Sequence, residues 1–296
     1  MAGNPCARAA VDQGRCMCRN GQGNVKRWPW AICLLLLLLS GCATVPGTTT
    51  GTVAGRSVEF ALEGEGTPVV VFENGLGATL DWWAKVWPDT VAESRALAYN
   101  RAGHGRSDAS MLPRDGAQVV EELRALLQAR DLPPPYVLVG HSLGGLYMRL
   151  FARQYPADVA ALVLVDSTHP DQVKGAGNPD HWPTWLKLVF RATTSDTAKQ
   201  ELAALDDTGA KVSSLPVDPA VPVWVLSALR AAGAPSALAT DAERKRADIS
   251  QLYPGSTQLW VDSGHGIPLE KPEAVVGAIR EAVRAARDAR DVRRAQ

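Results

Sequence analysis

The chain has 296 residues, of which 46% are hydrophobic, and its 31 basic and 31 acidic residues give a formal net charge of zero. This is the composition of an ordinary globular protein. A chain without net charge lacks the broad positive field that attracts nucleic acids or anionic membranes, so neither partner is expected on electrostatic grounds.

The first 41 residues are predicted to be a secretory signal peptide. Lys26 and Arg27 precede a short apolar run that ends at Leu39, which is the order that such signals have. The run is too short to span a bilayer, since about 20 apolar residues are needed. Residues 1–24 lack the short basic start of a signal, so we expect them to be a misassigned start and translation to begin at Val25 from a GTG codon.

The signal ends in Leu39-Ser-Gly-Cys42, which resembles the lipobox of bacterial lipoproteins. The resemblance implies cleavage before Cys42 and a lipid on its sulfur, which would anchor the protein stably in a membrane. The alternative is an ordinary signal peptide with a chance cysteine. Because Ala43 rather than Asp follows, the resemblance implies the outer membrane, facing the periplasm. Residues 42–54, rich in Thr and Gly, are predicted to be a flexible, lipid-anchored tether.

Cys42 is the last of the five cysteines. The body of the chain therefore holds no disulfide, no cysteine nucleophile and no cysteine-based metal site.

From residue 55 onward, strands and helices are predicted to alternate. Short apolar runs typical of buried strands occupy residues 68–73, 95–100, 136–139, 161–165, 221–226 and 257–261. Apolar residues at helical spacing or flanking prolines indicate helices at 114–130, 143–154 and 272–292. This alternation predicts an α/β fold, with a doubly wound, mostly parallel sheet and helices on both faces.

The alternation stops at about residues 167–220. An excursion of this length is rarely a plain loop, and it holds two tryptophans, Trp182 and Trp185. We predict a small helical cap, inserted into a single domain of residues 55–296.

The pentapeptide Gly140-His-Ser-Leu-Gly144 follows a predicted strand and opens a predicted helix. A serine at such a corner takes a strained conformation that exposes its hydroxyl, and glycines beside it avoid steric collision. The alternative role of Ser142 is a helix N-cap, which does not call for paired glycines. The pattern therefore predicts that Ser142 is a nucleophile.

Four motifs in chain order resemble the α/β-hydrolase superfamily: Glu73–Gly77, Tyr99–Asp108, the pentapeptide at Ser142 and Asp262–Gly266. The resemblance covers residues 56–284. It implies the α/β-hydrolase fold and the chain order serine, acid, histidine.

The resemblance implies His265, after the last strand, as the general base. His104, in the glycine-rich loop after the strand at 95–100, is expected to make structural hydrogen bonds, with a catalytic role as the alternative. The ring of His141, next to Ser142, is expected to face away from the hydroxyl. His169 and His181 lie in the predicted cap, either on its surface or near substrate.

The acid of the triad has two candidates. No carboxylate follows the strand at 221–226 until Asp241, whereas Asp166 ends the preceding strand. Haloalkane dehalogenases of this superfamily carry their acid at that earlier strand end. We therefore predict Asp166, with Asp241 as the alternative acid and a turn-forming role as the alternative for Asp166.

These residues predict a serine hydrolase that cleaves small-molecule carboxylic esters through an acyl-enzyme, without metal or organic cofactor. The resemblance implies an oxyanion hole made by the backbone N–H groups of Leu76 and Leu143. An amidase or peptidase, a carbon–carbon hydrolase and a non-catalytic binding module are the alternatives.

Four tryptophans are predicted to bind substrate: Trp82, Trp83, Trp182 and Trp185. Packing of the cap onto the body, or membrane contact of residues 182–190, would explain them as well.

Overall fold

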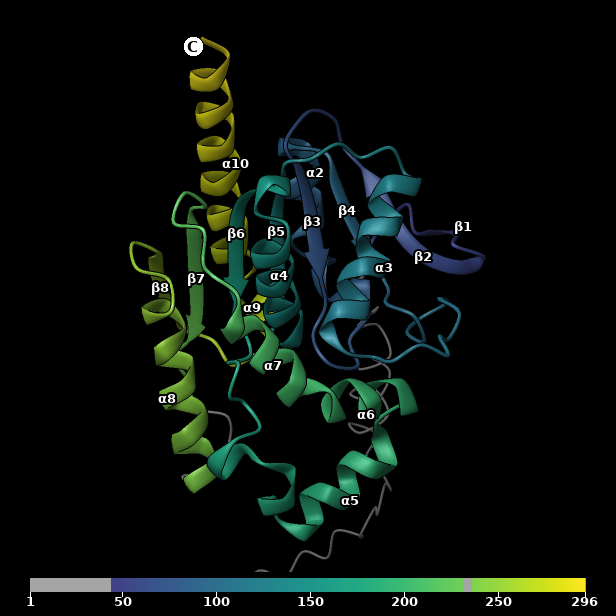
Figure 1. Cartoon of the computed structure of the whole chain (residues 1–296), viewed down its shortest axis with the longest axis vertical. Coiled ribbons are helices and arrows are strands. Elements are labelled where there is room, and N and C mark those ends of the chain that lie inside the picture. The colour runs from purple at the N-terminus through teal and green to yellow at the C-terminus, as the bar shows by residue number, and fades with distance from the viewer. Residues whose placement is uncertain (1–43, 231–235, 296) are drawn as a thin grey trace, which may run out of the picture. The chain divides into compact units, whose positions relative to one another are not determined.

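The computed structural model of the chain describes residues 44–230 and 236–295 (Figure 1). An eight-stranded sheet with the strand order β1-β2-β4-β3-β5-β6-β7-β8 organises this part of the chain. The strands are β1 (Thr49–Val53), β2 (Arg56–Glu63), β3 (Val69–Glu73), β4 (Ala96–Tyr99), β5 (Tyr136–His141), β6 (Val159–Val165), β7 (Val223–Ala228) and β8 (Thr257–Val261).

The sheet is parallel from β4 to β8, and only β1 and β2 pair antiparallel with their neighbours. Every residue of β3 and β5 is buried, as expected for central strands covered on both faces. The predicted mostly parallel sheet is therefore confirmed.

Helices cover both faces of the sheet, each over its own apolar cluster. One face carries α2 (Trp87–Glu93) and α10 (Pro272–Ala295). The other carries α3 (Gly116–Ala129), α4 (Leu143–Gln154) and part of α8 (Ala237–Gln251). Because α3 repeats apolar residues on one side only, it buries that side and leaves the rest in solvent.

Three α-helices separate β6 from β7: α5 (Thr184–Thr193), α6 (Asp196–Ala203) and α7 (Leu205–Ser214). In Figure 1 the arrows of β6 and β7 point toward these helices, which lie beyond the carboxyl ends of the strands. Helix α7 joins the core through Leu205 and Val212, whereas α5 buries none of its residues fully.

The prediction of a flexible tether at 42–54 is wrong for the residues that the structure describes. Thr49–Val53 forms β1 and pairs with β2, because β-branched threonine and valine suit an edge strand. Val45 is 3% exposed, and its N–H donates to the Asp81 carboxylate at 3.0 Å. The predicted signal peptide, the alternative start and the lipidation site Cys42 lie outside the described residues. Among the described helices, none combines the length and apolar character that a membrane crossing requires.

Candidate active site

Ser142 stands at the corner between β5 and α4 with φ +53° and ψ −123°. Its side chain makes no capping hydrogen bond, which removes the support for the N-cap role. A side chain on Gly144 would place its Cβ 2.4 Å from the Glu73 carbonyl oxygen, and one on Gly140 would lie 2.6 Å from the Gly144 oxygen. Contacts this short are not tolerated, so both glycines are needed to form the corner.

The structure brings Ser142, His265 and Asp166 together from three separate segments. Ser142 Oγ lies 3.0 Å from His265 Nε2, and His265 Nδ1 lies 2.6 Å from Asp166 Oδ2. With Nδ1–H donating to the carboxylate, Nε2 is free to accept the serine hydroxyl proton. This is the arrangement in which a serine gains a base and the base gains an orienting acid.

Asp166 is buried and held by more than His265. Its Oδ1 accepts from the Ala228 N–H at 3.0 Å and from Arg246 Nε at 2.7 Å. Burial by itself raises the pKa of Asp166, but the hydrogen bond from His265 and the charges of His265 and Arg246 outweigh it and lower the pKa below its ordinary value. The carboxylate therefore stays ionised, as an orienting acid must.

Arg246 was not singled out in the sequence. It belongs to the basic run Arg244–Arg246 on α8, and nothing in that run distinguishes the residue that reaches Asp166. The neighbouring Asp241, the alternative acid, pairs with Lys245 and Arg244 on the same helix, each at 2.5 Å. Its carboxylate is therefore held by two cations rather than by the imidazole.

A cavity of about 320 Å³ opens in front of Ser142 and His265. Leu76 and Leu143 both line it. Within the part of the chain that the structure describes, neither of their backbone N–H groups donates to a protein acceptor. Two unpaired donors beside a serine hydroxyl can receive the charge that develops on an acyl oxygen.

His141 faces away from the hydroxyl of its neighbour Ser142. Its Nε2 contacts the His265 carbonyl oxygen at 2.9 Å, and its ring stacks on Trp82 with the ring centres 5.0 Å apart. Burial and the nearby His265 lower the pKa of His141 to about 3. The neutral ring therefore donates through Nε2 and holds the backbone of His265 in place.

The four predicted substrate-binding tryptophans divide into different environments. Trp182 lines the cavity, and Trp82 lies beside the triad through its stacking on His141. The prediction for Trp83 is wrong, because this indole is fully buried in the core and donates to Asn74 Oδ1 at 2.7 Å. The prediction for Trp185 is not supported either, since α5 turns this side chain outward with 65% of its surface exposed.

Residues that sequence reasoning missed complete the cavity wall. They are Ser167, Thr168, Gln172, Leu202, Leu205, Ala242 and Arg246. Most of them follow β6 or lie in the helices between β6 and β7, where no motif marks individual positions. Among the described residues, no group of three or more His, Cys, Asp or Glu side chains is arranged to hold a metal ion.

Comparison with known proteins places this geometry in context. Residues 68–276 match the family model described as the alpha/beta hydrolase fold. The chain is 33% identical over 144 residues to the uncharacterized protein YqjL of Bacillus subtilis, covering 47% of this chain and 57% of that protein. It is 36% identical over 138 residues to a non-heme chloroperoxidase of Streptomyces lividans, covering 46% of this chain and 49% of that protein. The chain thus matches about half the length of these relatives.

Solved structures resemble the chain over most of its length. Cfl2 from Burkholderia cenocepacia has a TM-score of 0.60 at 21% identity, covering 80% of this chain and 95% of its own. A thermophilic esterase from Thermogutta terrifontis has a TM-score of 0.59 at 22% identity, covering 81% of this chain and 98% of its own. At such identities the likeness extends to the fold alone.

Proposed function

This chain belongs to the family of the alpha/beta hydrolase fold, and we propose that it is a serine hydrolase that cleaves carboxylic esters at Ser142. The proposal is carried by one observation. The Ser142 hydroxyl lies 3.0 Å from His265 Nε2, and the other ring nitrogen lies 2.6 Å from Asp166.

The proposed reaction begins when Ser142 Oγ attacks the acyl carbon of the ester and His265 Nε2 takes the hydroxyl proton. The oxyanion is bound by the N–H groups of Leu76 and Leu143, each worth about 3 kcal/mol in the transition state. His265 then gives the proton to the leaving alcohol oxygen, which leaves an acyl-enzyme. Water, deprotonated by His265, attacks the same carbon and releases the acid and free Ser142.

The walls of the cavity indicate the kind of substrate. Leu76, Leu143, Trp182, Leu202 and Leu205 present apolar surface. The volume of about 320 Å³ is near the lower end for ligand sites in proteins, about 300 Å³. We therefore propose small, apolar esters as substrates.

A panel of p-nitrophenyl esters beside the matching anilides tests the proposal. Ester turnover that falls about a thousandfold or more in Ser142→Ala supports it. Hydrolysis of anilides but not esters would favour the amidase alternative. A purified protein that neither turns over any acyl substrate nor reacts with a fluorophosphonate probe would favour a binding module.

We also propose that Cys42 carries a lipid that holds the enzyme at the outer membrane, facing the periplasm. The support is the lipobox-like sequence Leu39–Cys42. Cells fed an alkyne fatty acid should incorporate it into the wild-type protein and not into Cys42→Ala, and wild-type protein should fractionate with outer membranes. Equal labelling of both proteins, or recovery of the wild type in the periplasmic fluid, would contradict the proposal.

A further inference from the structure

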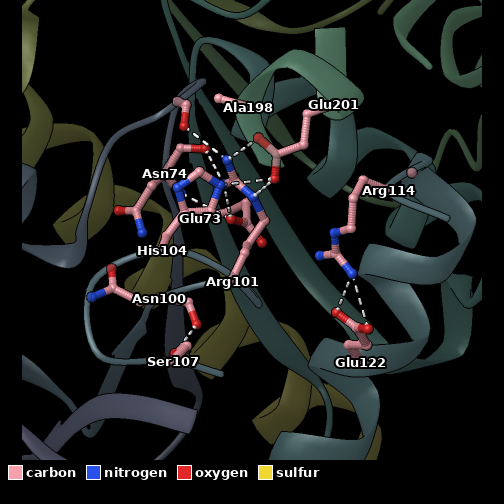
Figure 2. Close-up of polar contacts among 12 residues, drawn as sticks. Glu73, Asn74, Asn100, Arg101, His104, Ser107, Arg114, Glu122, Ala198 and Glu201 are labelled. Atoms are coloured by element: carbon pink, nitrogen blue, oxygen red, sulfur yellow. Dashed lines mark hydrogen bonds and ion pairs between the residues drawn. The ribbon is translucent and has the colours of Figure 1, made fainter. Parts of the chain in front are cut away.

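A buried ionic cluster lies between the loop after β3 and the helix α6. We call it the Arg101 cluster; it consists of Glu73, Arg101, His104 and Glu201 (Figure 2). The side chains of Arg101, Glu73 and Glu201 are each at most 1% exposed. None of these residues lines the cavity at Ser142, so the proposed reaction does not use them directly.

Arg101 holds the loop that carries one of the proposed oxyanion donors. Its guanidinium donates to the carbonyl oxygens of Asn74 at 2.7 Å and Gly75 at 2.9 Å. The Gly75 carbonyl belongs to the same peptide unit as the Leu76 N–H. In a trans peptide these two groups point in opposite directions. By holding the oxygen, Arg101 fixes the direction of the N–H of Leu76, a residue that lines the cavity.

The same guanidinium is bound to the helices between β6 and β7 through Glu201 of α6. Arg101 Nε donates to Glu201 Oε1 at 2.7 Å and Nη2 donates to Oε2 at 2.9 Å. This two-point geometry fixes orientation as well as distance. His104 Nε2 lies 3.2 Å from Glu201 Oε1 and adds a third contact.

Helix α6 also packs closely on the two loops that the cluster connects. A Cβ on Gly103 would lie 2.2 Å from Thr197 Oγ1, and a Cβ on Gly77 would lie 3.8 Å from that of Ala198. The helix therefore sits directly on the backbone of both loops. A displacement of α6 would move Glu201 and, through Arg101, the Gly75–Leu76 peptide.

The charges in the cluster fit this role. Burial by itself raises the pKa of Glu201, but Arg101 and the hydrogen bond from His104 outweigh it and lower the pKa to about 2. Burial raises the pKa of Glu73 instead. Arg101 also forms an ion pair with Glu73, its Nη1 lying 2.7 Å from Glu73 Oε1, so the guanidinium lies between one carboxylate from β3 and one from α6. A buried ion pair is weak as a source of stability, since well-packed apolar residues serve equally well.

We propose that Arg101 is a positioning residue for the oxyanion donor at Leu76. Through Glu201, the position of this donor depends on the packing of α6 against the loops. The inference rests on the proposed serine hydrolase function. The loop after β3, Arg101 and α6 then move together, and the Leu76 N–H is aligned only when α6 is packed against the loop.

The test compares Glu201→Gln with a matched control, Glu122→Gln. Glu122 forms a second ion pair with a buried arginine, Arg114, at 2.9 Å, and Figure 2 shows it apart from the Arg101 cluster. In Glu201→Gln we expect kcat on p-nitrophenyl acetate to fall about 10- to 100-fold while KM changes by less than about threefold. Affinity for a trifluoromethyl ketone, which forms an oxyanion on the serine, should fall by the same factor as kcat. Glu122→Gln should stay within about twofold of the wild type in all three values.

Backbone amide exchange of the segment 74–80 gives a readout that needs no catalysis. We expect faster exchange in Glu201→Gln than in Glu122→Gln. If the wild type hydrolyses no ester, the proposed function fails, and this exchange comparison alone then decides the coupling between α6 and the loop.

Equal kcat in the two variants, a KM effect without a kcat effect, or equal exchange would overturn the inference. Should Glu201→Gln fail to fold, Arg101→Lys keeps the positive charge but loses the two-point contact, and the same expectations apply to it.

Discussion

Single residues decide the chemistry at the carboxyl end of the sheet. Asp166 shows this best, because one carboxylate meets His265, Arg246 and a backbone N–H. Its backbone φ of +41° is unusual for a residue other than glycine. Strained residues of this kind persist where the surroundings over-determine them, often at functional sites.

Replacing Asp166 by Asn should lower kcat about 10⁴-fold, because the amide cannot hold the imidazole in the tautomer that accepts the serine proton. Asp241→Asn should stay within a few-fold of the wild type. Steady-state kinetics on a p-nitrophenyl ester measure both. A large loss in Asp241→Asn with activity retained in Asp166→Asn would reverse the assignment of the acid.

His141 should make the stability of the protein depend on pH. Its pKa is lowered to about 3 in the folded state, against an ordinary value of about 6.5 in the unfolded chain. Between these values the unfolded state binds a proton that the folded state does not. The free energy of unfolding should therefore decrease as pH falls below about 6.5, by up to about 1 kcal/mol per pH unit from this residue.

Urea unfolding at pH 7, 6, 5 and 4 measures this slope. His141→Gln should show a shallower decrease than the wild type, whereas His181→Gln, at an exposed position, should match it. Identical slopes for the wild type and His141→Gln would show that the buried ring does not contribute.

At the scale of elements, the strand–turn–helix unit β5–α4 is set by its glycines. The loop after β3 passes so close to α4 that Gly144 has no room for a side chain. Gly277 on α10 provides a contrast, since nothing lies within 4 Å of a Cβ placed there. Gly144 is therefore needed for steric reasons, whereas Gly277 has only the ordinary entropic cost of glycine in a helix.

Gly144→Ala should lower the free energy of unfolding by about 1–3 kcal/mol, because the new methyl group overlaps backbone atoms of the β3 loop. Gly277→Ala should raise it by up to about 1 kcal/mol, since alanine is the better helix former. Chemical denaturation compares the two. A neutral Gly144→Ala would mean that the close approach relaxes at little cost.

At the scale of the whole molecule, the cavity lies between the sheet and the helices that follow β6. Its lining combines the loop after β3, the corner between β5 and α4, the end of β6, and α6–α8. The residues that line the cavity include none from α5, whose side chains Trp185, Leu188 and Val189 are mainly exposed. The size of the cavity, and of the acyl group that we propose it binds, is therefore set by the packing of several elements.

For this reason we expect short esters to be better substrates than long ones. The value of kcat/KM for p-nitrophenyl acetate or butyrate should exceed that for the palmitate by at least about tenfold, because about 320 Å³ does not enclose a long acyl chain. Assays at substrate concentrations below micelle formation measure this. A preference for palmitate would show that the cavity extends when substrate binds.

The sequence by itself determined the alternation of strands and helices and the corner at Ser142, because each is carried by a local pattern, while the chain order of the family pointed to His265 as the proposed base. Apolar runs, paired glycines and chain order are all visible along the chain. The prediction of a flexible tether, made from the local composition, was wrong for residues 49–53, where pairing with β2 makes a strand of a Thr- and Gly-rich segment.

Only the tertiary structure decided what depends on contacts between distant segments. It placed Trp83 in the core, brought Arg246 to Asp166 and joined Arg101 to Glu201, which lies 100 residues further along the chain. A buried charge is stable only beside its partner, and the sequence of either partner does not name the other. Local patterns therefore give the elements and the proposed nucleophile, while the fold alone gives the neighbours that hold them in place.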